Sequence, residues 1–144
     1  IEPANRTLRG LRVLLTDDNA INRQVIKLFL AHQACEIVEA TNGKEALDKL
    51  AQGDFDIVLL DVHMPVMDGK ETIRRIRATD RWLHLPVIAL TADAMSGDRE
   101  KYLALGMTDY LSKPVDQREL IAKMHKVMGL EAPAAAAAPA ARTA

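Results

Sequence analysis

Residues 56–65 read DIVLLDVHMP, and in this stretch four apolar residues run directly into Asp61. A short, uniformly apolar run is typical of a strand that is covered on both faces. Such runs usually end in turn residues such as Gly, Asn or Pro rather than in an acid. The same pattern occurs at residues 12–18, RVLLTDD, where an apolar run meets Asp17 and Asp18. Buried carboxylates are costly, so three of them at two strand ends indicate a functional site.

Outward from these two runs, short apolar segments alternate with segments of helical length. We expect strands at residues 11–16, 35–40, 56–60, 86–90 and 109–112. We expect helices at residues 20–33, 68–78, 96–105 and 116–128, and a short helix that ends at Gly53. This alternation predicts βα units and a parallel sheet, and hence an α/β fold of the doubly wound type with five strands and five helices.

The 144 residues suit one domain, with a linker at residues 1–10, the folded domain at 11–130 and an Ala/Pro-rich tail at 131–144. A net charge of -1 argues against binding to nucleic acid or to an anionic membrane. The single cysteine excludes an internal disulfide and favours a cytoplasmic location. No apolar run has the length of a membrane span, and the start at Ile1 suggests a piece of a longer protein. His32, His84 and His125 have no partner motif and are expected at the surface.

Five polar side chains follow the predicted strands: Asp17, Asp18, Asp61, Thr91 and Lys113. In an open parallel sheet, ligands bind beyond the carboxyl ends of the strands, so these groups converge on one edge. Three carboxylates need a cation, and oxygen ligands without a Cys or His cluster favour Mg²⁺, with Mn²⁺ as an alternative.

The same groups suit phosphoryl chemistry. Lys113 would neutralise one phosphoryl oxygen, and the Thr91 hydroxyl would donate a hydrogen bond to another. No glycine-rich phosphate loop of the GxGxxG or GxxxxGK[ST] kind occurs, which argues against a bound nucleotide. The remaining option is covalent: a carboxylate attacks a phosphoryl group and becomes an acyl phosphate.

These motifs resemble the receiver domain of two-component response regulators, over residues 11–130. The resemblance rests on Asp17-Asp18, on DVHMPVMDG from Asp61, on LTAD around Thr91 and on SKP around Lys113. It implies a flavodoxin-like sheet in the strand order 2-1-3-4-5 and phosphorylation of Asp61 by a phosphohistidine.

The resemblance also implies the roles of the other residues. Asp17, Asp18, Asp61 and the backbone carbonyl of His63 would bind Mg²⁺. Thr91 and Lys113 would contact the phosphoryl group, and Tyr110 would act with Thr91 as a switch. The Lys113–Pro114 bond would be cis, which is affordable before proline.

The segments DDNAINRQV and TADAM are most similar to receivers of hybrid sensor kinases. The partner would then be a histidine kinase or a histidine-phosphotransfer protein, and this chain would be a phosphoacceptor rather than the kinase. The alternatives are a stand-alone response regulator, an aspartate-nucleophile phosphohydrolase, and a receiver that binds partners without phosphorylation. The hydrolase is disfavoured because His63 stands where such enzymes carry a second acid.

Plainer readings exist for several of these residues. Asp17 or Asp18 could cap the first helix, Thr91 could be an ordinary strand end, Lys113 a surface lysine and Tyr110 a core residue.

The first helix carries more apolar residues than one buried stripe needs. Ile26, Phe29 and Leu30 form one set with Asn22, and Ile21, Val25 and Leu28 form another, displaced around the axis. We expect the second set to be exposed and to dock a helical phosphotransfer partner. The alternative is a wide apolar arc that is wholly buried.

Overall fold

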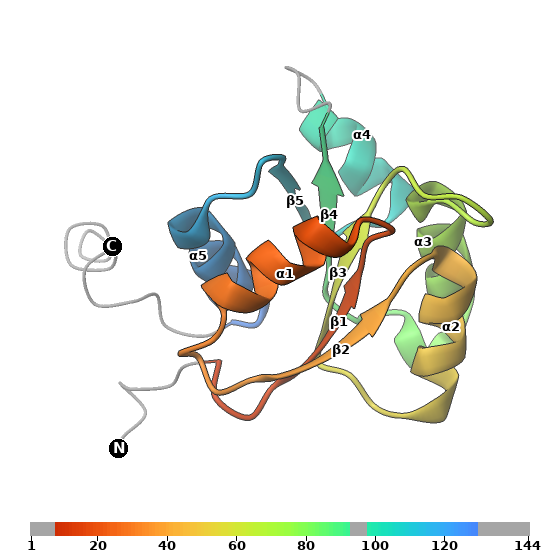
Figure 1. Ribbon diagram of the computed structural model, residues 1–144. Coiled ribbons are helices and arrows are strands. Elements are labelled where there is room, and N and C mark those ends of the chain that lie inside the picture. Colours follow the sequence, from red (N-terminus) through yellow and green to blue (C-terminus); the bar gives the residue numbers. More distant parts are fainter. Residues whose placement is uncertain (1–7, 93–97, 130–144) are drawn as a thin grey trace, which may run out of the picture.

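In the computed structural model, which describes residues 8–92 and 98–129, five strands form one parallel sheet (Figure 1). The strand order is β2-β1-β3-β4-β5, which confirms the expected order. The strands are β1 (Arg12–Thr16), β2 (Glu36–Ala40), β3 (Ile57–Asp61), β4 (Val87–Thr91) and β5 (Asp109–Ser112). The helices are α1 (Ala20–Phe29), α2 (Gly43–Gln52), α3 (Gly69–Arg77), the short 3-10 helix η2 (Asp80–Trp82), α4 (Asp98–Leu105) and α5 (Gln117–Val127). The predicted start of the fourth helix at residue 96 and the predicted tail at 131–144 lie outside the described residues.

Short polar side chains start the helices. Asn19, Asn42, Asp68 and Asp116 each accept hydrogen bonds from backbone N–H groups of the first helical turn. The first helix ends at Phe29, four residues earlier than predicted. Its apolar pattern continues, but residues 30–34 turn the chain toward β2, and Ala34 adopts a positive φ of 57°.

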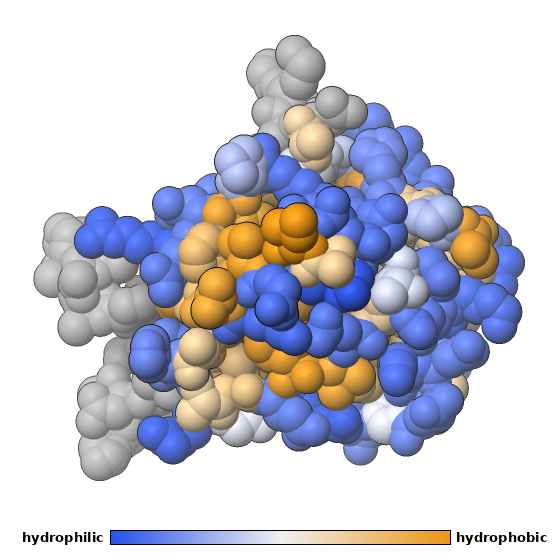
Figure 2. Space-filling view, viewed as in Figure 1, coloured by the Kyte–Doolittle hydropathy of each residue, from blue (hydrophilic) through white to orange (hydrophobic). Residues whose placement is uncertain are grey.

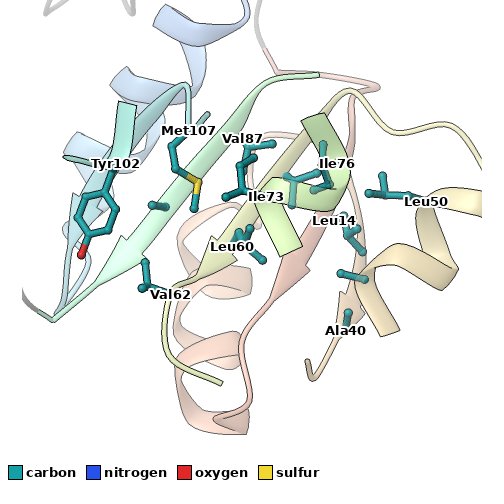
Figure 3. Packing of buried hydrophobic residues seen from close by; sticks show 13 residues of the cluster. Leu14, Ala40, Leu50, Leu60, Val62, Ile73, Ile76, Val87, Tyr102 and Met107 are labelled. Carbon is teal, nitrogen blue, oxygen red and sulfur yellow. The ribbon is translucent and has the colours of Figure 1, made fainter. Parts of the chain in front are cut away.

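The helices cover both faces of the sheet, α1 and α5 on one side and α2 and α3 on the other (Figure 1). Each face has its own hydrophobic core. The core under α2, α3 and α4 includes Leu60, Val87 and Tyr102 (Figure 3). The core under α1 and α5 includes Leu59, Leu90 and Leu120. Strands that are covered on both faces account for the uniformly apolar runs in the sequence.

The folded domain begins earlier than predicted. Leu8 falls within the expected linker, but its side chain is fully buried in the core under α1 and α5. Gly10 then adopts a positive φ of 80° and donates a backbone hydrogen bond to Ala34. Residues 8–10 therefore belong to the domain rather than to a linker.

His125 also differs from its expectation. It is buried on α5 rather than exposed, and its Nδ1 lies 2.8 Å from the Ile121 carbonyl oxygen.

The register of the sheet decides which face each strand-end side chain occupies. Asp61 pairs with Leu90, and Thr91 pairs with Ser112. Thr91 comes one residue after Leu90, and successive side chains of a strand point to opposite faces. Asp61 and Thr91 therefore project from opposite faces of the sheet, at the same edge.

The described helices include none that is long and apolar enough to cross a membrane.

Candidate functional site

Three carboxylates meet at the carboxyl edge of the sheet. Asp17 follows β1 and is fully buried, Asp18 is exposed beside it, and Asp61 ends β3 with 3% of its surface exposed. One oxygen from each lies within 4.8 Å of the others. The strand ends thus bring the three predicted acids together.

The loop after β1 fixes the position of Asp17. Its Oδ1 accepts a hydrogen bond from the Asn19 backbone N–H at 2.9 Å, and its backbone carbonyl accepts one from Arg23 Nη1 at 2.7 Å. Asn19, and neither acid, caps the first helix. Helix capping therefore does not explain the two acids.

Lys113 lies between the two buried carboxylates. Its Nζ is 3.2 Å from Asp17 Oδ2 and 3.1 Å from Asp61 Oδ1, and only 22% of its side chain is exposed. The Lys113–Pro114 bond that follows is cis, as the resemblance implied. Lys113 is therefore part of the cluster and not a surface lysine.

Burial and charge alter the proton affinities of this cluster. Desolvation raises the pKa of Asp61, the Asp17 carboxylate raises it further, and Lys113 opposes both effects. Burial lowers the pKa of Lys113, but the two carboxylates outweigh this, so that its pKa is raised overall. The site thus has an excess of negative charge that one ammonium group only partly balances.

The donor set fits a divalent cation. Within the described residues, Asp17 Oδ2 is a buried oxygen without a hydrogen bond, although it forms an ion pair with Lys113. Oxygen donors from three carboxylates match the preference of Mg²⁺ for hard ligands.

The loop after β3 passes directly over Asp61. The exposed residue His63 donates its backbone N–H to Asp61 Oδ1 at 3.3 Å. Gly69 starts α3 so close to this strand end that a Cβ atom there would lie 2.4 Å from the Asp61 carbonyl oxygen. Only glycine permits that approach, which accounts for Gly69 in the motif.

Thr91 and Tyr110 occupy the other side of the edge. Thr91 is fully buried, and its Oγ1 lies 3.0 Å from the Tyr102 hydroxyl. Tyr110 is half-buried, with its ring 5.9 Å from that of Tyr102 and with Lys123 Nζ 4.7 Å above it. Tyr102 carries no signal of a role at the site in the sequence, because an aromatic residue within a helical segment is ordinarily a core residue.

The second apolar set on α1 is exposed. Ile21 is 72% exposed, Leu28 70% and Val25 37%, whereas Ile26 and Leu30 are buried. Figure 2 shows the resulting apolar patch over α1. The wholly buried arc is therefore excluded. A hollow of about 100 Å³ beside Val25 reaches Asp17 and Lys113.

Comparisons with known proteins agree with this geometry. The profile of the response regulator receiver domain matches residues 13–125. The chain is 39% identical over 125 residues to the sensor protein GacS of Pseudomonas syringae pv. syringae, covering 85% of this chain and 14% of that protein. It is 36% identical over 111 residues to the histidine-protein kinase BarA of Escherichia coli K12, covering 77% of this chain and 12% of the kinase. The chain thus spans a small part of these sensor kinases.

Solved structures show the same fold. The receiver domain of sensor histidine kinase PA1611 from Pseudomonas aeruginosa PAO1, which has a magnesium ion in its active-site cleft, aligns with a TM-score of 0.76 and 37% identity over 83% of this chain and 98% of that one. The receiver domain of Ssk1 from Saccharomyces cerevisiae, in complex with the phosphotransfer protein Ypd1, gives a TM-score of 0.79 and 28% identity over 89% and 95%. With its acid cluster, fold and strand order, the chain belongs to the response regulator receiver domains of two-component phosphorelays, and its relatives include receiver segments of sensor kinases.

Proposed function

We propose that Asp61 of this receiver domain accepts a phosphoryl group from a phosphohistidine in a Mg²⁺-dependent reaction. The observation that carries the proposal is the cluster of Asp17, Asp18 and Asp61 with Lys113 Nζ between two of them. A carboxylate with a neighbouring ammonium group, at the ligand-binding edge of a parallel sheet, suits nucleophilic attack on an anionic phosphoryl group.

In the proposed step, a carboxylate oxygen of Asp61 forms a bond to phosphorus while the bond between phosphorus and the imidazole nitrogen breaks. The electron pair of the broken bond stays on the nitrogen, and the partner's histidine is released. Lys113 is close enough to Asp61 to stay with the product and pair with a phosphoryl oxygen. Thr91 would donate its hydroxyl to another phosphoryl oxygen after a change of side-chain orientation.

The carboxylates of Asp17, Asp18 and Asp61, together with the backbone carbonyl of His63, are the ligands we assign to Mg²⁺; Mn²⁺ would use the same oxygen atoms. A bound divalent cation would offset the charge on the phosphoryl oxygens during transfer.

We assign the switch to Thr91 and Tyr110. Movement of Thr91 toward the phosphoryl group changes the packing between β4 and β5, where Tyr110 lies half-buried. This change would carry the signal to the side of the sheet covered by α4.

Because several of its relatives are sensor kinases of which it covers a small part, we infer that the chain is the receiver segment of a cytoplasmic hybrid sensor kinase. Its partner is then a histidine kinase domain or a histidine-phosphotransfer protein. The Ssk1 receiver binds such a protein, Ypd1.

We place the docking surface on Ile21, Val25 and Leu28. This apolar patch lies on the helix that follows Asp17, and the hollow beside it leads to the acid cluster. An apolar helix of the partner could pack there while its histidine reaches Asp61.

The test is incubation of the chain with Mg²⁺ and a small acyl phosphate, followed by mass spectrometry and alkaline treatment. We expect one base-labile phosphoryl group on Asp61, none without Mg²⁺ and none in Asp61→Asn. Turnover of many phosphomonoesters would instead identify a hydrolase. No adduct, or an adduct retained in Asp61→Asn, would contradict the proposal.

A further inference from the structure

We infer that Tyr102 is a positioning residue for Thr91: its hydroxyl holds the Thr91 hydroxyl on the α4 side of the sheet, and phosphoryl binding must break this hydrogen bond. The inference rests on the proposed function of Asp61. It adds a residue of α4 to the phosphorylation site and makes α4 the first element to respond.

The hydrogen bond is deeply buried. Thr91 is fully buried, Tyr102 is 2% exposed, and their oxygen atoms are 3.0 Å apart. Figure 3 shows Tyr102 within the core under α2, α3 and α4, with its hydroxyl directed toward the carboxyl end of β4. Such a bond resists separation, because a buried polar group that loses its partner costs about 1–3 kcal/mol.

The sheet register places the two competing partners of Thr91 on opposite faces. Asp61 is paired with Leu90 on the neighbouring strand, so the two side chains point to the same face of the sheet. The side chain of Leu90 lies in the core under α1 and α5. Thr91 comes one residue later and contacts Tyr102, which belongs to the other core. The Lys113 ammonium group, which marks the phosphoryl side, contacts Asp17 and Asp61.

Either hydroxyl can be the donor in the bond between Thr91 and Tyr102, so the position of the Thr91 oxygen, on the Tyr102 side of the sheet, is what matters. Phosphoryl oxygens only accept hydrogen bonds. To donate to a phosphoryl group on Asp61, the Thr91 hydroxyl has to turn from the Tyr102 side toward the edge above Asp61. The bond to Tyr102 and the bond to the phosphoryl group are therefore alternatives.

The neighbouring ring is less free to respond first. The Lys123 ammonium group lies 4.7 Å above the Tyr110 ring and also donates to the Tyr110 carbonyl at 2.6 Å. The Tyr102 hydroxyl, in contrast, is hydrogen-bonded to the Thr91 hydroxyl itself. Departure of Thr91 therefore leaves a buried tyrosine hydroxyl on α4 to find a new partner, and this couples the site to α4.

The experiment measures the affinity of the chain for beryllofluoride, a non-covalent phosphoryl analogue, at saturating Mg²⁺ by NMR titration. Tyr102→Phe removes the hydroxyl and keeps the ring. We expect it to bind beryllofluoride about 3- to 10-fold more tightly, the range that one neutral hydrogen bond supplies. Amide shifts on beryllofluoride binding at residues 100–105 should shrink, because α4 no longer loses a bond when Thr91 turns.

A double-mutant cycle separates positioning from packing. In a Thr91→Val background no hydroxyl competes, so Tyr102→Phe should leave the beryllofluoride affinity unchanged and should regain unfolding stability. An equal effect in both backgrounds would show that Tyr102 acts only through packing and would overturn the inference. Weaker or unchanged binding by Tyr102→Phe in the wild-type background would overturn it too.

The wild-type chain distinguishes this failure from that of the proposed function. If the wild type binds beryllofluoride and is phosphorylated on Asp61, but the cycle shows no coupling, only the role of Tyr102 is wrong. If the wild type does neither, the phosphoacceptor function is wrong, and the role of Tyr102 falls with it.

Discussion

At the scale of single residues, the site brings three carboxylates to one ammonium group. Asp17 and Asp61 are both buried and share one ammonium group, that of Lys113, while Asp18 stands exposed beside them. Lys113 keeps the buried pair compatible with the fold, and the exposed acid can be spared structurally. We therefore expect Asp18 to serve the proposed Mg²⁺ site alone, whereas Asp17 and Asp61 also pair with Lys113 inside the fold.

Asp18→Asn tests this division. Because Asp18 is exposed, we expect its loss to leave the free energy of unfolding within about 0.5 kcal/mol of the wild type without metal. Mg²⁺ affinity should fall at least about tenfold, since even outer-shell partners of a metal cost 10- to 100-fold when removed. Isothermal titration with Mg²⁺ measures this. Asp54→Asn is the control, because Asp54 lies away from the cluster and its side chain is 95% exposed. Equal Mg²⁺ affinities of Asp18→Asn and the wild type would exclude Asp18 as a ligand.

Asp61→Asn should change the pH dependence of stability. The pKa of Asp61 is raised in the folded state, first by desolvation and then by Asp17, so the folded chain holds this proton more tightly than the unfolded chain does. Wild-type stability is then lost as the pH rises from the ordinary carboxyl range of about 3.9 through the raised pKa. Asn carries no such proton.

Without divalent cations, Asp61→Asn should therefore gain stability over the wild type as the pH rises through this window, and the gap should be constant above it. Urea unfolding at a series of pH values measures the gap. Saturating Mg²⁺ should narrow it, because the metal stabilises the ionised carboxylate. A gap that is constant across the whole series would mean that the folded domain does not perturb Asp61.

Strand-end chemistry made the acid cluster predictable from the sequence. Asp17, Asp18 and Asp61 stand out because acids rarely end buried runs, and parallel strands bring such ends to one edge. Tyr102 and His125 were missed for the opposite reason. Each looks like an ordinary helical residue, and its burial and hydrogen bond depend on which neighbour the tertiary structure supplies.

At the scale of elements, α1 connects the acid cluster to an outer surface. Its N-cap Asn19 also donates to Asp17, and Arg23 and Lys27 pair with Glu39 of β2 at 2.8 Å each. These contacts fix the rotation of the helix, so that Ile26 and Leu30 are buried while Ile21 and Leu28 face outward. The apolar patch follows from this fixed rotation.

Ile21→Glu and Leu28→Glu test the patch as a docking surface. Both positions are at least 70% exposed, so the added charge should leave the fold intact. Phosphotransfer from a histidine-phosphotransfer protein should slow about tenfold or more, the effect of losing about 1.4 kcal/mol of binding. Phosphorylation by a small acyl phosphate should keep its rate, because that donor needs no docking surface.

Leu83→Glu is the matched control. Leu83 is 46% exposed and precedes β4, at the opposite edge of the sheet from Asp61. Both donors should phosphorylate this variant at the wild-type rate. Equal slowing of both donors in the α1 variants would show that the patch supports the site itself rather than a partner.

Element types were predictable, and element ends were less so. Every described strand and α-helix was expected, because apolar runs and helical periodicity depend on local sequence. The end of α1 at Phe29 was not, because the periodicity of α1 continues into residues whose backbone turns toward β2.

At the scale of the whole molecule, the sheet separates two cores, and the acid edge belongs to both. Asp17, Asp61 and Lys113 stand above the core under α1 and α5, whereas Thr91 and Tyr102 join the other. In the proposed switch, the signal from Asp61 to α4 crosses the sheet at Thr91. The core that a strand residue joins follows from its position along the strand, because successive side chains point to opposite faces. That both cores end at the same acid edge is a property of the assembled sheet.

The limit of the domain was the part of the overall organisation that sequence patterns missed. Residues 1–10 have no periodicity, so Leu8 carried no signal as a lone apolar residue. In the structure it closes the core under α1 and α5, next to Leu11 and Cys35 of the same cluster. Leu8 itself lies in no predicted element, so its burial becomes visible only in the assembled fold.

Leu8→Ala should therefore destabilise the whole domain. Truncation of a fully buried leucine costs about 2–5 kcal/mol, through lost burial and the cavity it leaves. Urea unfolding should show a lower midpoint with an unchanged slope, because the same surface is exposed on unfolding. Leu83→Ala, at the leucine that is 46% exposed, should shift stability by no more than about 0.5 kcal/mol. Equal and small effects of the two variants would return residues 8–10 to the linker. Leu8 precedes β1, whereas Asp17 follows it, so the two residues lie at opposite ends of this strand. The Leu8→Ala chain should therefore still be phosphorylated on Asp61 at temperatures where it remains folded.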